Sequence, residues 1–139
     1  MAIKINTEKR IFTLETKHTM YQMQADTYGV LRHLWYGAKT GCDMSYLQDY
    51  PDVGFSGNPH DAGNDRTYSL DTLPLEYAGA GIGDFRVPAV EAVHADGSCA
   101  LDLRYYSHTV KQGKYAIAGL PALYAGEDEA ETLEVVLRD

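Results

Sequence analysis

Apolar and polar residues alternate with a period of two in several short runs near the start of the chain. Such alternation is typical of strands that bury one face. Residues 3–6 and 11–15 are separated by a polar break of hairpin length, residues 7–10. Residues 21–24 follow, and then residues 30–36, which are rich in β-forming side chains and lie between two glycines. None of these runs is long enough for a convincing helix, so they predict four early strands.

The last fifty residues repeat this pattern of short runs and turns. Residues 90–94 and 99–106 flank an Asp-Gly pair, a strong hairpin signal because both positions tolerate positive φ. Residues 115–118 form another short run between turns. Residues 131–137 contain enough Glu and Leu for a helix, but the alternation of Leu133, Val135 and Leu137 favours a strand. Many short strands separated by turns predict an all-β antiparallel sandwich.

The central segment, residues 55–89, has no sustained period and holds much of the Gly and Pro. A connection of this length inside a compact domain is usually either functional or disordered. Apolar side chains are spaced through it and can offset the entropy of ordering. These are Phe55, Tyr68, Leu70, Leu73, Leu75, Tyr77 and Phe85. We therefore predict an ordered loop with a function.

Length and charge narrow the classes of partner. The chain has 139 residues, enough for one domain, and a net charge of −8 from 12 basic and 20 acidic residues. The basic residues are not clustered, which argues against nucleic acid and against an anionic membrane surface as partners. We see no apolar run of signal-peptide or membrane-spanning length. The two cysteines fit neither a metal site nor a disulfide framework, so we expect a cytoplasmic protein with reduced thiols.

Several candidate motifs have weak support. Gly79, Gly81 and Gly83 are spaced as G-x-G-x-G without a surrounding strand–helix unit, which indicates a flexible turn and no nucleotide site. The five histidines are scattered, so we expect no metal and no cofactor. Ser107 is followed by His108, but adjacency in sequence does not make a catalytic triad.

Acidic residues in or beside the central segment admit two interpretations. They are Asp52, Asp61, Asp65, Asp71, Glu76 and Asp84, with Arg66 and Arg86 among them. One interpretation is turn capping and internal ion pairing, the ordinary work of Asp and Ser in loops. The other is a polyol site, in which Asp, Asn and Arg beside an aromatic ring recognise sugar hydroxyls. The residues themselves leave both open.

Longer motifs in the same segment carry a family resemblance. They read FSGNP, NDRTYSLDTLPLEY and GIGDFRVPA, and the flanking residues 29–37, 103–108, 119–122 and 131–134 agree with them. Together they resemble the N-terminal domain of the microbial α-galactosidases of glycoside hydrolase family 36. The resemblance extends over essentially the whole chain.

The resemblance implies a fold and an activity. In that family a large supersandwich-like β-sandwich, of the galactose mutarotase type, precedes a catalytic (β/α)8 barrel that carries an Asp nucleophile and an Asp acid/base. Because a barrel needs about 250 residues, it cannot lie within this chain. We expect residues 1–139 to be part of the sandwich domain of a longer polypeptide and to be inactive alone. The whole enzyme would hydrolyse melibiose- and raffinose-type α-galactosides with retention.

The family also suggests a role for the central segment. Its members are commonly tetramers in which this loop reaches the active-site mouth of a neighbouring subunit. Asp52 and Arg66 fall at positions that contact substrate, and Phe55 falls where it would support the loop. We therefore expect an α-galactoside substrate, a homotetramer and contact with the chain's own C-terminal barrel. Two alternatives remain: a non-catalytic carbohydrate-binding β-sandwich module, and a purely structural interaction domain.

Overall fold

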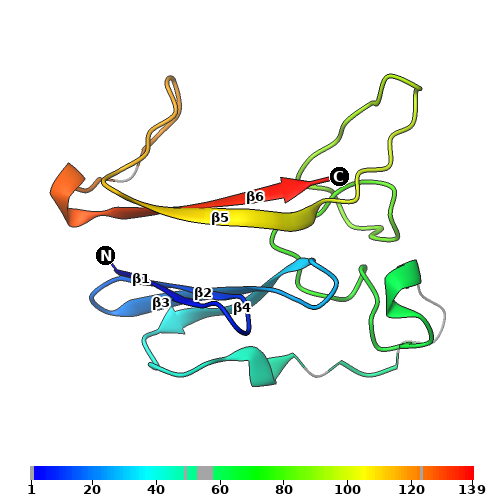
Figure 1. Cartoon of the computed structure of the whole chain (residues 1–139), viewed down its shortest axis with the longest axis horizontal. Coiled ribbons are helices and arrows are strands. Elements are labelled where there is room, and N and C mark those ends of the chain that lie inside the picture. The colour runs from blue at the N-terminus through cyan, green and yellow to red at the C-terminus, as the bar shows by residue number, and fades with distance from the viewer. Residues whose placement is uncertain (1, 49, 53–57, 123) are drawn as a thin grey trace.

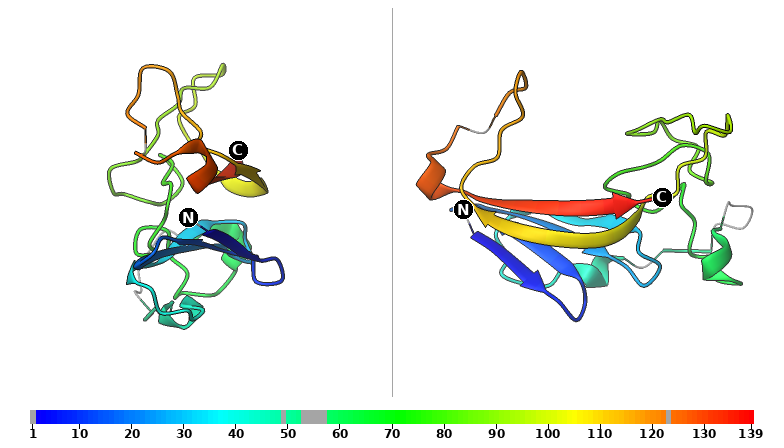
Figure 2. Two further views of the ribbon diagram at one scale, coloured as in Figure 1. Left: turned by 90° about the vertical axis from the view of Figure 1, so that its left-hand side faces the viewer. Right: turned by 45° about the horizontal axis from the view of Figure 1, so that its top comes forward.

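The computed structural model describes residues 2–48, 50–52, 58–122 and 124–139, and within these it consists of two antiparallel sheets that face each other (Figures 1 and 2). The first sheet has the order β1 (Ala2–Asn6), β2 (Ile11–Glu15), β3 (Thr19–Ala25) and β4 (Leu31–Ala38). The second pairs β5 (Arg104–Gln112) with β6 (Glu131–Arg138). The 3₁₀ turns are η1 (Ser45–Leu47), η2 (His60–Ala62) and η3 (Glu127–Glu129). The all-β sandwich prediction is confirmed.

The inner face of the first sheet packs against the second sheet. Phe12 is fully buried, and the register places it opposite Met23 on β3 and Ile5 on β1. Its ring lies 5.9 Å from that of Tyr105 and 4.9 Å from the imidazole of His108, both on β5. From β6 the alternating residues Leu133, Val135 and Leu137 pack on the same cluster. The period-two pattern therefore marks the packed face of β6 correctly, whereas β2 is buried on both faces.

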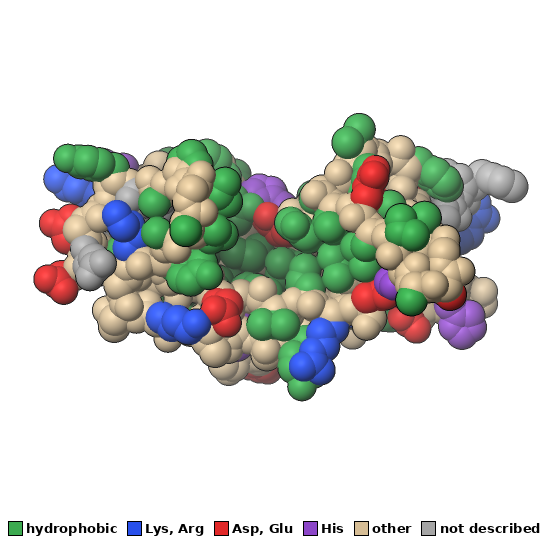
Figure 3. Space-filling view, turned by 90° about the horizontal axis from the view of Figure 1, so that it is seen from above, with side chains coloured by type: hydrophobic (Ala, Val, Ile, Leu, Met, Phe, Trp, Pro, Cys, Tyr) green, Lys and Arg blue, Asp and Glu red, His purple; other side chains and the backbone are tan. Residues whose placement is uncertain are grey.

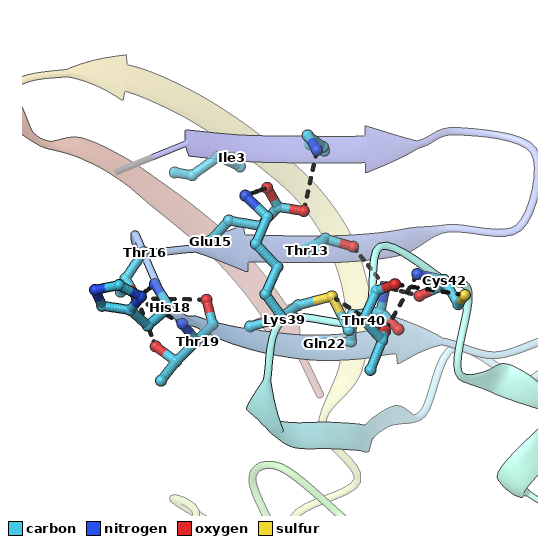
Figure 4. Close-up of polar contacts among 12 residues, drawn as sticks. Ile3, Thr13, Glu15, Thr16, His18, Thr19, Gln22, Lys39, Thr40 and Cys42 are labelled. Carbon is cyan, nitrogen blue, oxygen red and sulfur yellow. Dashed lines mark hydrogen bonds and ion pairs between the residues drawn. The ribbon is translucent and has the colours of Figure 1, made fainter.

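The outer face of the first sheet is covered by the segment that follows β4. The buried Gln22 side chain donates 3.0 Å hydrogen bonds to Thr13 Oγ1 and to the carbonyl of Cys42 (Figure 4). It also accepts a hydrogen bond from the Met44 amide. Glu15, which is 4% exposed, pairs with Lys39 Nζ at 2.6 Å and with Lys4 Nζ at 3.0 Å. These polar contacts fix the segment to the sheet without leaving a buried charge unpaired.

The structure contradicts two predicted strands, residues 90–94 and 115–118, and the first part of a third, residues 99–106, of which residues 104–106 belong to β5. The Asp-Gly turn forms, with Gly97 at φ 86° and its amide 2.9 Å from the carbonyl of His94. However, residues 90–94 and 99–103 do not pair as a hairpin. Instead, the amides of Ala89 and Leu101 donate to the carbonyls of Ala78 and Ala80, each at 2.9 Å. The predicted hairpin thus stops at the bond from the His94 amide to the Ser98 carbonyl, and Leu101 bonds to the glycine-rich segment instead.

The run at residues 115–118 is also not a strand. β5 ends at Gln112, and the next residue, Gly113, has a φ of 92°. The chain then leaves the sheet in a projecting arm (Figure 1). Tyr115 and Ile117 are 66% and 55% exposed. Because both lie outside any layer, their apolar character does not produce strand pairing.

The central segment is ordered in the part that the structure describes, residues 58–89. Tyr68, Leu70 and Leu73 are almost fully buried and pack with Val30. This confirms that the segment builds its own core. Tyr77 and Phe85 were expected to join it, but they are 49% and 83% exposed. Phe55, predicted to support the loop, lies outside the described residues.

A search for membrane-spanning elements gave no candidate: within the described ranges, no helix has the length and apolar character to cross a bilayer.

Candidate functional site

Asp52 and Arg66, the two predicted substrate contacts, lie next to each other. Arg66 Nε is 3.2 Å from Asp52 Oδ1, and the side chains are 61% and 53% exposed, respectively. Such an exposed pair contributes little to folding, because water screens it and ordering two side chains costs entropy. The carboxylate and guanidinium therefore form an exposed polar pair at the protein surface, with donors and acceptors of the kind that bind sugar hydroxyls.

A tight turn determines where Arg66 is placed. Asp65 Oδ1 accepts hydrogen bonds from the Thr67 amide at 3.0 Å and from Thr67 Oγ1 at 2.6 Å. These bonds hold the pKa of Asp65 below its usual range. Asn58 Nδ2 donates to the Asp65 carbonyl at 2.8 Å and ties the start of the described loop to this turn. The local sequence N-D-R-T thus forms an Asx turn that projects Arg66 outward.

Tyr68 anchors the turn to the first sheet. Its hydroxyl donates to Asp26 Oδ2 at 2.5 Å, and its ring meets that of Tyr28 edge-on at 4.7 Å. Burial and the hydrogen bond to Asp26 raise the pKa of Tyr68, so it remains a donor. Asp26 is 4% exposed, and its other oxygen accepts from the amides of Tyr28 and Val30 at 2.9 Å each. The position of Arg66 is therefore set by the buried β3–β4 connection.

Arg86 holds the other end of the segment. Its Nη2 donates to the carbonyls of Leu70 and Leu73 at 2.7 and 2.8 Å. Its Nε donates to Asp84 Oδ1 at 2.8 Å, and this contact lowers the pKa of the buried Asp84 carboxyl. Two residues of the G-D-F-R motif thus fasten the S-L-D-T-L turn to the following loop. Sequence spacing suggested an ion pair here, but gave no hint of the two carbonyl contacts.

The acidic residues of the central segment do not converge on one site. Asp61 Oδ2 lies 3.7 Å from Arg104, and Asp71 accepts a hydrogen bond from Ser69. Each is occupied by a local partner, as Asp65 and Asp84 are. For these four residues the turn and ion-pair interpretation holds, and the exposed Asp52–Arg66 pair is the part of the set that remains a candidate binding site.

A second polar cluster joins β3, β4 and the central segment. Glu76 accepts a hydrogen bond from the Tyr21 hydroxyl, and its other oxygen lies 2.9 Å from His33 Nδ1. Burial, and then the hydrogen bond to Glu76, raises the pKa of Tyr21. The strand pattern places Tyr21 and His33 on one face, but Glu76 arrives from a loop and was not predicted to join them. Glu76 also lines a groove of about 430 Å³ between the sheets.

Neither metal nor triad chemistry is assembled in the part of the chain that the structure describes. No group of three or more His, Cys, Asp or Glu side chains there could hold a metal ion. His108 Nδ1 lies 2.6 Å from the hydroxyl of Tyr105, and its ring packs on Phe12. Its imidazole therefore belongs to the packing between the sheets.

Comparison with known families gives one match over most of the chain. Residues 29–139 match the glycosyl hydrolase family 36 N-terminal domain. The matched part contains both Asp52 and Arg66, together with Tyr68 and Arg86 that position the loop.

Individual relatives agree with this match. The chain is 53% identical, over 139 residues, to the bifunctional α-galactosidase/sucrose kinase AgaSK of Mediterraneibacter gnavus, covering 100% of this chain and 15% of that protein. It is 42% identical over 142 residues to α-galactosidase AgaA of Geobacillus stearothermophilus, covering 100% and 19%. The chain thus spans less than a fifth of each of these two relatives.

Solved structures give the same result. The galactosidase domain of AgaSK superposes with a TM-score of 0.94 at 53% identity, over 99% of this chain and 19% of that one. A crystal structure of a Geobacillus stearothermophilus AgaA variant in complex with raffinose superposes with a TM-score of 0.81 at 40% identity, over 91% and 18%.

Proposed function

The chain belongs to the family of glycosyl hydrolase family 36 N-terminal domains, and from this premise we propose that it is the first part of a longer retaining α-galactosidase. The similarity to AgaSK and AgaA, each an α-galactosidase by name, supports the activity. The raffinose bound to an AgaA variant supports α-galactosides of the melibiose and raffinose type as substrates. Residues 1–139 would form part of the N-terminal sandwich domain, and the catalytic barrel would lie outside them.

Retaining hydrolysis needs two carboxyl groups about 5–5.5 Å apart across the scissile bond. One attacks the anomeric carbon and forms a covalent glycosyl-enzyme. The other protonates the leaving oxygen and then activates water. Of the described acidic residues in the central segment, Asp61, Asp65, Asp71 and Asp84 are engaged in turns and ion pairs, which supports a location of both catalytic carboxyls in the barrel. We therefore expect the 139 residues alone to hydrolyse no galactoside.

The role we assign to this segment is subunit assembly and closure of a neighbouring subunit's substrate pocket in a cytoplasmic homotetramer. The observation that carries this role is the exposed Asp52–Arg66 pair, with Arg66 on a segment held by the buried Tyr68 hydroxyl and by the backbone contacts of Arg86. Asp52 would accept hydrogen bonds from sugar hydroxyls, and Arg66 would orient that carboxylate. Because the turn at Asp65 and the Tyr68 hydroxyl already position Arg66, that side chain would lose little entropy on binding.

Kinetics of Asp52→Ala in the full-length enzyme would test this role. We expect an unchanged tetramer and a kcat/KM on raffinose lowered by about 10- to 100-fold, equivalent to about 1.4–2.8 kcal/mol of lost transition-state stabilisation. Asp96→Ala, on an exposed turn outside the central segment, is the matched control and should leave kinetics unchanged. Normal kinetics in a folded Asp52→Ala tetramer would refute the assignment.

A second measurement separates this role from a stand-alone sugar-binding module. Galactose and raffinose are titrated by calorimetry against the 139-residue chain and against the full-length enzyme with its nucleophile removed. If another subunit's barrel completes the site, only the full-length enzyme should bind the sugars, and the 139-residue chain should not. Binding of either sugar by the short chain would contradict it.

A further inference from the structure

Basic side chains gather in one pocket at an end of the first sheet. Lys9, Arg10 and Arg32 line this pocket, whose volume is about 290 Å³, together with the carboxylates of Glu8 and Asp26. On the face seen from above, by contrast, Lys and Arg side chains are scattered around a hydrophobic hollow in the middle of the molecule (Figure 3). The pocket is therefore a place where a chain with a net charge of −8 presents three cations together.

Strand pairing places the two arginines close together at this end of the sheet. Gln24 of β3 lies opposite Arg32 of β4. On the other side of β3, the Ala25 amide donates a 3.0 Å hydrogen bond to the carbonyl of Arg10, which immediately precedes β2. Arg10, Gln24 and Arg32 therefore form a row across the same end of β2, β3 and β4. Gln24 follows Met23, which packs toward the second sheet, so the row lies on the opposite, outer face.

Two of the three cations are already paired inside the protein. Asp26, which is 4% exposed, lies with its Oδ2 3.3 Å from Arg32 Nε, and its backbone carbonyl accepts a hydrogen bond from Arg10 Nη2. Lys9 Nζ lies 2.6 Å from the carboxylate of Asp43. Arg10 forms no ion pair with any residue that the structure describes. Asp26 thus fixes one side of both guanidinium groups, and the charge of Arg10 is left without a carboxylate partner.

The two guanidinium groups keep most of their donors unused. The Arg32 side chain is only 14% exposed, yet none of its N–H groups donates a hydrogen bond to a described residue. Its Nε is fully buried without a hydrogen bond, despite the short distance to Asp26. Arg10 donates through Nη2, and its Nε and Nη1 have no acceptor in the described part of the chain. Since a cation this buried normally has its donors satisfied, the arrangement points to an acceptor supplied from outside.

We propose that this pocket binds a phosphate dianion, either free or as the phosphate group of a small sugar phosphate. A guanidinium presents its N–H groups as a planar fork that matches two phosphate oxygens. Arg10 and Arg32 would both donate to the phosphate, with the Thr27 hydroxyl and the second amide hydrogen of Gln24 beside it. At about 290 Å³ the pocket is at the lower end of the range for small-molecule sites, which limits the ligand to a small one. The proposal does not depend on the reaction of the complete protein.

The number of donors favours phosphate over a carboxylate from a partner protein. A phosphate monoester carries a charge of about −1.5 to −2 at pH 7 and three strong acceptor oxygens. The pocket offers two guanidinium groups, a hydroxyl and an amide, which together exceed the roughly four lone-pair sites of one carboxylate. Glu8, an exposed carboxylate in the lining, opposes the binding of any anion. Its removal should therefore strengthen binding.

Calorimetry on the full-length protein tests the proposal. Inorganic phosphate, galactose 1-phosphate and acetate are titrated at pH 7 and an ionic strength of about 50 mM, where screening is weak. We expect at least one of the two phosphates to bind with a Kd of about 1 mM or below, and acetate to bind at least about tenfold more weakly. Tighter binding of galactose 1-phosphate than of inorganic phosphate identifies a sugar phosphate as the ligand; otherwise the ligand is free phosphate. Binding of neither phosphate, or equal binding of acetate, would overturn the proposal.

Variants locate the binding within the protein. Arg10→Gln and Arg32→Gln should each weaken phosphate binding at least about tenfold, because each removes a charged donor. Glu8→Gln should strengthen it about two- to threefold, since it removes an exposed like charge. Lys111→Gln is the matched control: it also removes one positive charge, but from an exposed ion pair outside the pocket, and the Kd should stay within about twofold.

Circular dichroism shows whether each variant is folded. If Arg32→Gln fails to fold because the buried Asp26 loses its ion-pair partner, Arg10→Gln decides the test, since Arg10 contacts only the backbone carbonyl of Asp26. Equal Kd values in folded Arg10→Gln and Lys111→Gln would overturn the proposal.

Discussion

The hydrogen bond between Tyr68 and Asp26 offers a quantitative test of how the central segment is held. Tyr68→Phe removes one oxygen and keeps the ring, which packs at 4.7 Å on Tyr28 and lies 5.9 Å from the Arg32 guanidinium carbon. The lost bond is a neutral donor to a buried carboxylate, a class worth about 1.5–3 kcal/mol. The Asp26 oxygen that loses this bond remains 3.3 Å from Arg32 Nε, so its buried charge still has a partner of opposite charge. We expect a destabilisation of about 2 kcal/mol.

Urea and thermal unfolding of the chain would measure this change. An unfolding entropy of about 2.1 cal/mol/K per residue converts about 2 kcal/mol into a fall in Tm of about 7 °C for a chain of this length. Tyr28→Phe is the matched control, since its hydroxyl makes no hydrogen bond to any residue that the structure describes, and it should shift Tm by less than about 2 °C. A double-mutant cycle with Asp26→Asn should give a coupling energy above about 1 kcal/mol. A coupling near zero, or equal losses in the two Tyr→Phe variants, would refute the reasoning.

Two further predictions concern the core and the response to acid. Leu73→Ala, at a site 1% exposed, should lower the unfolding free energy by about 2–5 kcal/mol, whereas Leu120→Ala, 60% exposed on the arm, should change it by less than about 0.5 kcal/mol in the same urea titration. Similar effects of the two would show that the central segment does not form a core. The Lys9 contact lowers the pKa of Asp43 to about 2, and Lys39 followed by Lys4 lowers that of Glu15. A carboxyl group whose pKa is lower in the folded than in the unfolded state stabilises the fold at every pH above its unfolded-state pKa. We therefore expect this contribution to be complete above about pH 5 and to fall progressively toward pH 2. Lys9→Met should flatten this dependence in denaturation curves taken at several pH values, and an unaltered slope would contradict the ion-pair assignment.

The sequence predicted the strands best where burial and periodicity agree. β2 matches its predicted range, residues 11–15, and β6 was separated from a helix by the alternation of Leu133, Val135 and Leu137. Residues 90–94 and 99–103 contain similar short runs, but the amide of Leu101 bonds to the carbonyl of Ala80 and Val90 forms an isolated bridge with Gly79. Periodicity describes side-chain faces and carries no information about the backbone partner. This is why the turn was predicted correctly and its flanking strands were not.

The candidate site shows a similar division. Asp52 and Arg66 were singled out by family resemblance, and fourteen positions separate them in sequence, too far for spacing to pair them. The Tyr21–Glu76–His33 cluster was missed because it depends on a loop returning across β4, a contact with no local signature. By contrast, the turn at Asp65 follows from short-range chemistry, and it agrees with the turn-capping interpretation that the sequence left open beside the polyol site.

The order of the strands in the chain has a consequence for synthesis on the ribosome. β1 to β4 pair with sequential neighbours through short connections, so their contacts can form as soon as residue 38 has emerged. β5 and β6 must wait for about a hundred further residues, and until then Phe12 and its neighbours stay uncovered. In nascent chains stalled after β4, we expect the amides of the first sheet to be protected from hydrogen exchange. We also expect the uncovered inner face of this sheet to bind chaperones. Hydrogen exchange on stalled ribosome complexes would measure the protection. The four-stranded sheet β1–β4 would thus form first, and β5 and β6 would pack on it afterwards.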